Sequence, residues 1–479
     1  FIVVIFCLLL SFSAHAGNFP VFGRDQVEGT CLLEDHSEAL LRWSRQGVEN
    51  AVLINIDAHD DLRWIAPEKI ETLKRLVQKK DWKSIEMSDS GGDDGLYHPG
   101  SFIYAACKLG MISRVYWVIP FSYFQVPEVT KALNRFLAAY GFDKRSINTF
   151  SLHNGCYQGV CEGISLTICG VENLPQIDEP VILSIDADFF PPFAHWYGRD
   201  ILTAMSEFFF EIAQKQYRIR DAFVACSVNG GFLSANRRWI AGHCMEILEQ
   251  PQRISGPYPE EWLVHNLADT YYVGGSADAL LDLTRRFNRR YPQDLCLMSY
   301  RVFALQATGN NRDAYELACT LGSIDKRYAF ILADLGQGLI DQGNLDAALP
   351  CFRAAYQSNP HMNFRQKNLG DALMAAGKYG QAIYYYDIYR QKNGPFPVAF
   401  AMGSAACKLG DDFQARTWFE QGVVSLKHVR YQSDFSEIDV TAIRHAATFF
   451  RQKKLPDTAR IITSHPYLQN VFEQSGNGT

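Results

Sequence analysis

Short apolar runs separated by helical sequence mark the first half of the chain. Runs of this length, bounded by polar residues, are typical of strands in a parallel sheet that is covered on both faces. They predict strands at 51–56, 115–120, 181–185 and 222–226. Helical periodicity predicts helices at 67–80, 101–109 and 199–215, and one more from Ser37. The alternation predicts an α/β fold, with a three-layer parallel sheet and helices on both faces.

The strand-like runs stop near residue 257, and a helical pattern with a period of about 34 residues follows. Small residues recur with it at Gly336, Gly370 and Gly403, and each copy has another glycine seven residues later. This pattern is typical of tetratricopeptide repeats, which are paired helices with small residues where the two helices touch. Because single units cannot bury their faces alone, we expect about five or six stacked copies, an all-α tetratricopeptide solenoid.

The length of the chain indicates more than one domain, and its net charge bears on the kind of partner it binds. A chain of 479 residues is too long for one ordinary core. We expect the α/β domain at 17–255, the repeats at 256–465 and a C-terminal tail at 466–479. The composition is that of a globular protein, and the net charge of −6 gives no support to a nucleic-acid or general membrane-surface partner.

The first sixteen residues differ from the rest. Residues 1–12 are almost wholly apolar, and Ala14-His15-Ala16 follows. This pattern predicts a signal peptide at 1–16, and therefore export to the periplasm or secretion from the cell. The apolar run is too short for a stable membrane span. The alternatives are a buried edge element of a cytoplasmic protein or an uncleaved anchor. In an exported protein, Cys156 and Cys161 are the expected disulfide; a zinc site that includes His153 is the alternative.

Polar side chains that can bind metal follow two of the predicted strands. Asp57, His59 and Asp61 come directly after strand 51–56, and Asp186 and Asp188 follow strand 181–185. The carboxyl ends of parallel strands share one edge, where α/β proteins place their sites. His36, at the start of the helix from Ser37, is expected to face the same edge. Asp60 is expected to point away, because side chains alternate along an extended segment.

Four carboxylates in one apolar site repel one another unless cations compensate them. The predicted set is Asp57, Asp61, Asp186 and Asp188 with the imidazoles of His36 and His59. Oxygen and nitrogen ligands without thiolate favour Mn²⁺ over a structural Zn²⁺. Two such ions can lower the pKa of a water enough to form hydroxide at neutral pH. The pattern therefore predicts two manganese ions and hydrolytic chemistry.

These segments resemble those of the ureohydrolases, the superfamily of arginase and agmatinase. Glu34-Asp35-His36-Ser37, the Asp-x-His-x-Asp segment 57–61 and the Ser-x-Asp-x-Asp segment 184–188 occur in the family's order, and the resemblance covers about residues 20–235. It implies that 17–255 is an arginase-like metallohydrolase domain. It also implies that one manganese binds His36, Asp57, Asp61 and Asp186, and the other Asp57, His59, Asp186 and Asp188. Related deacetylases keep part of this set and bind one zinc.

The resemblance also suggests catalytic and substrate-binding residues. His98, in His-Pro-Gly-Ser, falls where arginases have a proton-shuttling His, so it is the candidate general acid/base; the alternative is a His that only lines its loop. Ser227 stands where arginases carry a Glu, and the free amino-acid loop of arginases is not evident. Ser227 and Asn229 are therefore candidate substrate contacts. Acidic contacts to guanidinium could come from Asp93, Asp94 or Glu34.

These departures resemble a divergent branch that includes the peptide arginases, which convert arginine residues of a peptide into ornithine. We therefore expect a binuclear manganese hydrolase that releases urea from an arginine-containing peptide or protein. The repeat groove is expected to bind a peptide or protein partner. The alternatives are an amide hydrolase or deacetylase on the same metal platform, and a non-catalytic metal-binding scaffold that displays the repeats.

Overall fold

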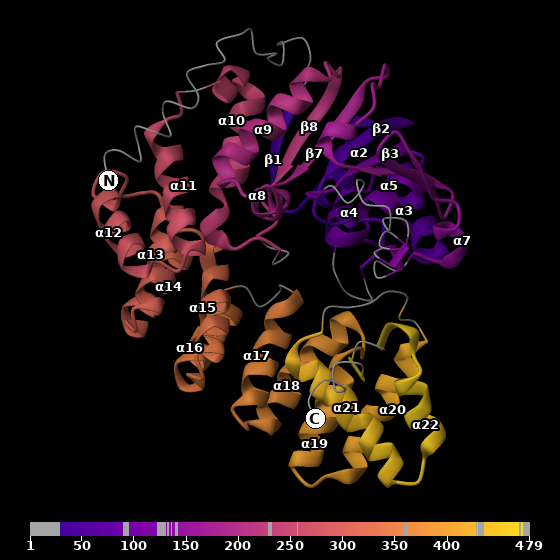
Figure 1. Cartoon of the computed structure of the whole chain (residues 1–479). Helices are drawn as coiled ribbons and strands as arrows, with labels where there is room; N and C mark the ends of the chain where they lie inside the picture. The colour runs from indigo at the N-terminus through magenta and orange to yellow at the C-terminus, as the bar shows by residue number, and fades with distance from the viewer. Residues whose placement is uncertain are drawn as a thin grey trace.

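The structure is a computed structural model of the whole chain, shown in Figure 1. It describes residues 29–89, 95–121, 142–228, 232–255, 257–358, 363–427 and 435–468, with a few isolated positions at 131–138, 429 and 471–472. The predicted signal peptide lies outside the described residues, as does most of the predicted tail. Among the described residues, no helix is long and apolar enough to cross a membrane.

The described strands form one eight-stranded sheet with the order β1-β8-β7-β2-β3-β6-β5-β4. The strands are β1 (Thr30–Leu33), β2 (Ala51–Ile56), β3 (Ile112–Val118), β4 (Ser151–His153), β5 (Cys156–Cys161), β6 (Ile164–Cys169), β7 (Val181–Asp186) and β8 (Ile219–Ala225). Strands β1, β8, β7, β2, β3 and β6 pair in parallel, which confirms an α/β domain. The antiparallel edge β6-β5-β4 was not predicted as strands.

Two tight turns explain this antiparallel edge. Asn154 and Gly155 join β4 to β5, and Glu162 and Gly163 join β5 to β6; all four have positive φ. Two-residue turns of this conformation match the twist of paired strands and therefore form hairpins. The turn chemistry, and not hydrophobic alternation, defines these strands.

Helices cover both faces of the sheet. Leu53, Trp117 and Phe223 belong to a core cluster with residues of α2 (Glu38–Gln46), α3 (Pro67–Lys79) and α5 (Phe102–Lys108). The alternate residues Ile54 and Val224 belong to a second cluster with α8 (Phe190–Tyr197), α9 (Ile201–Gln214) and α10 (Trp239–Glu249). Apolar side chains on both faces explain the continuous apolar runs of these strands. The short helices α4 (Trp82–Met87) and α7 (Lys144–Ile147) complete this part.

The C-terminal half is a tetratricopeptide-like helical solenoid. Within the described residues it consists of six helix pairs. These are α11 (Glu260–Val273) with α12 (Ala277–Asn288), α13 (Leu295–Ala307) with α14 (Asn311–Ile324), α15 (Ile331–Asp341) with α16 (Leu345–Ser358), α17 (Asn363–Ala375) with α18 (Tyr379–Asn393), α19 (Val398–Lys408) with α20 (Asp412–Leu426), and α21 (Glu437–Gln452) with α22 (Pro456–Thr463). Figure 1 shows these pairs in succession, from pink to yellow, below and beside the sheet.

The recurrent glycines lie where the helices of a pair touch. A Cβ added to Gly336 would lie 2.8 Å from the ring of Phe352, and one added to Gly370 would lie 2.6 Å from the ring of Tyr386. Gly403 contacts the ring of Phe419 in the same way. The first helix of each of these pairs thus has a glycine at the point of contact, because a larger residue would overlap the buried aromatic ring of the second helix.

The expected disulfide between Cys156 and Cys161 is wrong, because both cysteines are free thiols. They stand at opposite ends of β5, so their Cα atoms are roughly 16 Å apart along the strand. A disulfide requires Cα atoms within about 7 Å. The Cys156 thiol instead donates a hydrogen bond to the backbone carbonyl of Asn173 (3.1 Å).

We predict that Gly370→Ala destabilises the solenoid by about 1–3 kcal/mol, because the new methyl group overlaps the buried Tyr386 ring. The measurement is the free energy of unfolding in urea. Gly380→Ala in α18 is the matched control, since nothing lies within 4 Å of its added Cβ. It should be neutral or slightly stabilising. Equal destabilisation by both changes would contradict the packing role of Gly370.

Candidate metal centre

The six predicted ligands all follow the carboxyl ends of parallel strands. Asp57, His59 and Asp61 follow β2, whereas Asp186 ends β7 and Asp188 lies in the 3-10 helix Ala187–Phe189 directly after it. Strands β2 and β7 are neighbours with Ile56 opposite Ile185, so the two segments leave the sheet side by side. His36 reaches them from the segment between β1 and α2. The structure therefore brings together all six residues.

His36 stands at the centre of the first half of the cluster. Its Nδ1 atom lies 2.8 Å from Asp186 Oδ2, 3.2 Å from Asp61 Oδ2 and 3.3 Å from Asp57 Oδ2. The ligand atoms of His36, Asp57 and Asp61 lie close enough together to hold one ion.

His59 stands at the centre of the second half. Its Nδ1 atom lies 2.9 Å from Asp188 Oδ2 and 3.5 Å from Asp57 Oδ1. Asp57, His59 and Asp188 form a second group that could hold an ion. Asp57 belongs to both groups, with Oδ2 toward His36 and Oδ1 toward His59. This is the arrangement that a carboxylate bridging two ions requires.

Four buried ligand atoms have no hydrogen-bond partner among the described residues. They are His36 Nδ1, His59 Nδ1, Asp61 Oδ2 and Asp188 Oδ2. Two close pairs of a nitrogen and an oxygen result: His36 Nδ1 lies 3.2 Å from Asp61 Oδ2, and His59 Nδ1 lies 2.9 Å from Asp188 Oδ2. Unpaired buried polar atoms are costly, and coordinated cations would satisfy all four. The donor set, carboxylate oxygen and imidazole nitrogen, fits a pair of divalent ions such as Mn²⁺.

The charges of the cluster also call for compensation. Burial, reinforced by Asp186 and Asp57, raises the pKa of Asp188 to about 7. Burial and the charge of Asp57 raise the pKa of Asp61 well above its ordinary value. Burial disfavours a charged His59, but the carboxylates of Asp188 and Asp57 outweigh it and raise the pKa of the imidazole to about 11. The cluster alone therefore attracts protons, and divalent cations would replace them.

Hydrogen bonds hold the ligand carboxylates in place. The backbone N–H of His59 donates to Asp57 Oδ1 (2.7 Å), and that of Asp188 donates to Asp186 Oδ1 (3.0 Å). The Ser227 hydroxyl donates to Asp186 Oδ2 (2.5 Å). Both carboxylate oxygens of Asp186 thus accept hydrogen bonds. Among the described residues Asp57 belongs to both ligand groups and Asp186 to neither, so the expected binding of both ions by Asp186 stays a prediction. Ser227, a candidate substrate contact, is buried and orients a ligand.

Two residues of the site adopt left-handed backbone conformations. Asp61 has φ of 52° and Ser227 has φ of 50°. Non-glycine residues adopt this conformation infrequently, and it persists where surrounding contacts enforce it. Here it turns Asp61 toward His36 and Ser227 toward Asp186. Neither conformation is signalled by the sequence.

His98 lies at the start of the 3-10 helix Pro99–Ser101, which leads into α5. Its Nδ1 accepts a hydrogen bond from the backbone N–H of Gly100 (3.1 Å). Burial and the positive charge of Arg63 lower the pKa of His98 to about 3. The imidazole is therefore neutral, with its proton on Nε2. Within the described residues, His98 belongs to neither ligand group. Phe102, further along the same segment, packs against His36, with their ring centroids 5.0 Å apart.

The remaining candidates divide into two sets. Asn229, Asp93 and Asp94 lie outside the described residues.

Glu34 is already engaged: both its carboxylate oxygens accept hydrogen bonds from Arg238, and Arg327 Nη1 lies 3.2 Å from Oε1. Arg327 belongs to the solenoid, so this cluster joins the repeats to the strand that precedes His36. Asp60 is buried and belongs to neither ligand group.

No local pattern in the sequence points to Phe232, which packs against the candidate ligand His59. Its ring centroid is 4.5 Å from that of His59, and the residue is half-exposed. Phe232 follows β8 in an irregular segment without periodicity, so no hydrophobic pattern identifies it. Two residues on, the Ser234 hydroxyl donates to Asp334 of α15 (3.0 Å).

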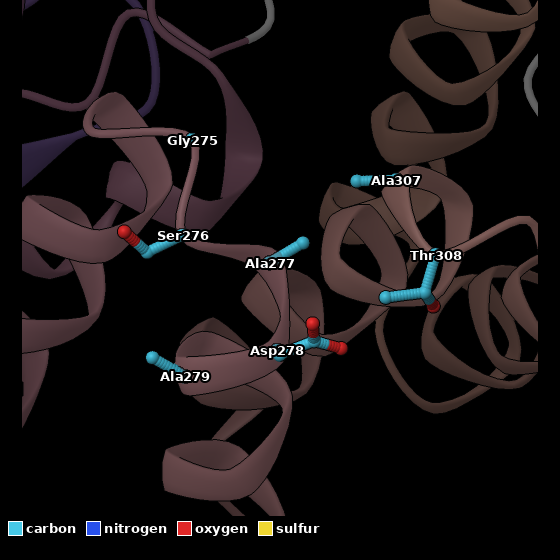
Figure 2. A pocket seen from close by; sticks show the side chains of 7 residues that line it. All are labelled: Gly275, Ser276, Ala277, Asp278, Ala279, Ala307 and Thr308. Carbon is cyan, nitrogen blue, oxygen red and sulfur yellow. The ribbon is translucent and has the colours of Figure 1, made fainter.

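Other polar clusters and hollows of the described residues are less suited to this chemistry. A hollow of about 610 Å³ lies between the α11–α12 turn and Ala307 and Thr308, with Asp278 as its single charged side chain (Figure 2). A third group of possible ligands, Glu261, His265 and Asp294, lies in the solenoid. There His265 Nε2 already shares a hydrogen bond with Asp294 Oδ2 (2.8 Å), so this imidazole is satisfied without an ion.

Comparisons with known proteins find similarity at the level of fold alone. No family model matches the chain, and no curated protein matches its sequence. The MamA protein matches with 18% identity and a TM-score of 0.29, over 36% of this chain and 96% of MamA. PilF of Pseudomonas aeruginosa matches with 18% identity and a TM-score of 0.30, over 43% of this chain and 89% of PilF. A thermophilic TPR protein of Thermus thermophilus matches with 18% identity and a TM-score of 0.25, over 40% of this chain and 99% of its own.

We predict that Asp57→Ala removes both metal ions, because Asp57 belongs to both ligand groups. Asp61→Ala and Asp188→Ala should each leave about one ion per chain. The measurement is bound manganese by mass spectrometry after dialysis. Asp60→Asn is the control and should retain both ions. Two ions bound to Asp57→Ala would contradict the shared-ligand assignment.

Proposed function

We propose that the protein is a binuclear manganese hydrolase that releases urea from arginine side chains in a peptide or protein and leaves ornithine. The observation that carries the proposal is the pair of ligand groups that share Asp57, with four ligand atoms left without hydrogen bonds. The presence of both Asp61 and Asp188 favours two ions over one. The order of the three ligand segments, which resembles that of the ureohydrolases and of their peptide-arginase branch, supports a guanidinium substrate and an arginase-like fold.

The reaction consumes one water: its oxygen bonds to the guanidinium carbon, the bond from that carbon to the side-chain nitrogen breaks, and the departing amine takes up a proton. The bound ions would supply Lewis-acid activation of water. The residues of the chain hold this chemistry in place. Ser227 and the N–H groups of His59 and Asp188 fix the ligand carboxylates, and the covered sheet keeps most of the site away from bulk solvent.

The presence of the solenoid favours a peptide or protein over a small molecule as the substrate. Helical-repeat arrays present extended surfaces that suit peptides and proteins. Arg237, just before α10, donates to Asp269 of α11, and Arg327 between α14 and α15 lies 3.2 Å from Glu34. These contacts anchor the first repeats beside the metal-bearing domain. A peptide held by the repeats is thereby kept near the metal centre, which favours an arginine residue of a chain over free arginine.

We predict that the manganese-loaded protein releases urea from arginine-containing peptides, with kcat/KM at least about tenfold higher than for free arginine, because the peptide adds binding energy away from the reacting group. The measurement is urea release over a panel of peptides. Asp57→Ala is the inactive control. No urea from any guanidinium substrate, with two ions bound per chain, would refute the proposal.

We also predict that His98→Asn lowers kcat by about 100-fold with both ions retained, as expected for loss of a proton-transfer group. The measurement is kcat for urea release together with the manganese content. An unchanged kcat would instead mean that His98 only lines its loop and accepts the Gly100 hydrogen bond.

A further inference from the structure

Solvent reaches the metal centre at one ligand. The His59 side chain is 31% exposed, whereas the side chains of the other five ligands are at most 3% exposed. A substrate that approaches the shared carboxylate of Asp57 must therefore pass His59. The residues around this imidazole decide which side chains can enter.

Phe232 is the aromatic residue beside this entrance. Its ring centroid lies 4.5 Å from that of His59 at an interplanar angle of 53°, and the residue is 45% exposed. The Nδ1 edge of the His59 ring faces the carboxylates of Asp57 and Asp188. Metal binding does not require an exposed apolar ring at this position, so the ring is available for contact with a ligand.

Hydrogen bonds hold the two residues that directly follow Phe232. The backbone N–H of Leu233 donates to the carbonyl oxygen of Ser227 (3.1 Å), and Ser227 itself binds Asp186. The Ser234 hydroxyl donates to Asp334 of α15 (3.0 Å). Phe232 thus contacts His59 and lies two residues before Ser234, whose hydroxyl contacts the solenoid.

An arginine side chain is well matched to such a ring. Its methylene stem packs on apolar surfaces, and its planar guanidinium group stacks on aromatic faces. This chain makes the same contact elsewhere: Arg365 lies 4.4 Å from the ring centre of Phe330, and Arg390 lies 5.3 Å from that of Trp418. The compact, strongly hydrated ammonium group of lysine has no planar face to stack.

We propose that Phe232 is a substrate-positioning residue, against whose ring the arginine side chain of a peptide lies as its guanidinium group passes His59. This inference rests on the proposed function and adds a selectivity for arginine over lysine that is set before the reaction. A purely structural role, in which Phe232 only holds the His59 ring in place, is the alternative that the experiment must separate.

The experiment measures binding of two fluorescent pentapeptides, Ala-Ala-Arg-Ala-Ala and its lysine counterpart, to the full-length manganese-loaded protein by anisotropy. Phe232→Ala should raise the Kd for the arginine peptide by about tenfold and abolish most of its preference over the lysine peptide. Phe232→Tyr, which keeps the ring, should stay within about twofold of the wild type. Phe413→Ala, at a residue of α20 that is 84% exposed, is the control and should have no effect.

Manganese content is measured in parallel and should remain two ions per chain in each variant. Loss of manganese from Phe232→Ala would assign the ring to support of His59 and overturn the proposal, as would an unchanged Kd or equal Kd values for both peptides in the wild type. Wild-type binding of the arginine peptide without urea release would refute hydrolysis alone, and the Kd of Phe232→Ala would still decide the role of the ring.

Discussion

Repulsion among buried carboxylates is the constraint on which the rest of this structure depends. Parallel pairing of β2 with β7 places Asp57 and Asp186 at the ends of neighbouring strands, and Asp61 and Asp188 follow within a few residues. Like charges this close are unfavourable in a buried site unless cations or protons offset them. The two imidazoles offset only part of this charge. The cluster therefore has a strong physical reason to hold divalent ions, whatever reaction they serve.

Rigidity of the surroundings follows from the same constraint. The strands that carry the ligands are packed by apolar side chains on both faces, so they cannot move apart to relieve the repulsion. Hydrogen bonds from Ser227 and from backbone N–H groups fix the carboxylate orientations, and left-handed conformations at Asp61 and Ser227 complete the geometry. A site assembled in this way is formed before its ligands bind, which lowers the cost of binding them.

The features that could be predicted from the sequence are the helical repeats and the polar residues at the ends of buried strands. Apolar runs predicted β2 and β7, and the polar residues after them predicted the cluster. The glycine period predicted the solenoid, because each glycine makes room for one ring. The short edge strand β1 and the hairpins of β4 to β6 were missed, since β1 is too short to show a pattern and turn residues define the hairpins. Contacts such as Phe232 with His59 depend on segments that are distant in sequence, and no local pattern encodes them.

The connection after β8 links the two halves of the molecule. Within a short stretch, Ser227 binds a metal-site carboxylate, Phe232 covers His59, Ser234 binds Asp334 and Arg238 binds Glu34. A shift of α15 relative to the sheet would therefore move the segment in which Phe232 contacts His59. Polar contacts at both ends of this connection therefore couple the solenoid to the residues around the candidate metal centre. The two halves are thus joined by specific side-chain contacts as well as by the chain itself.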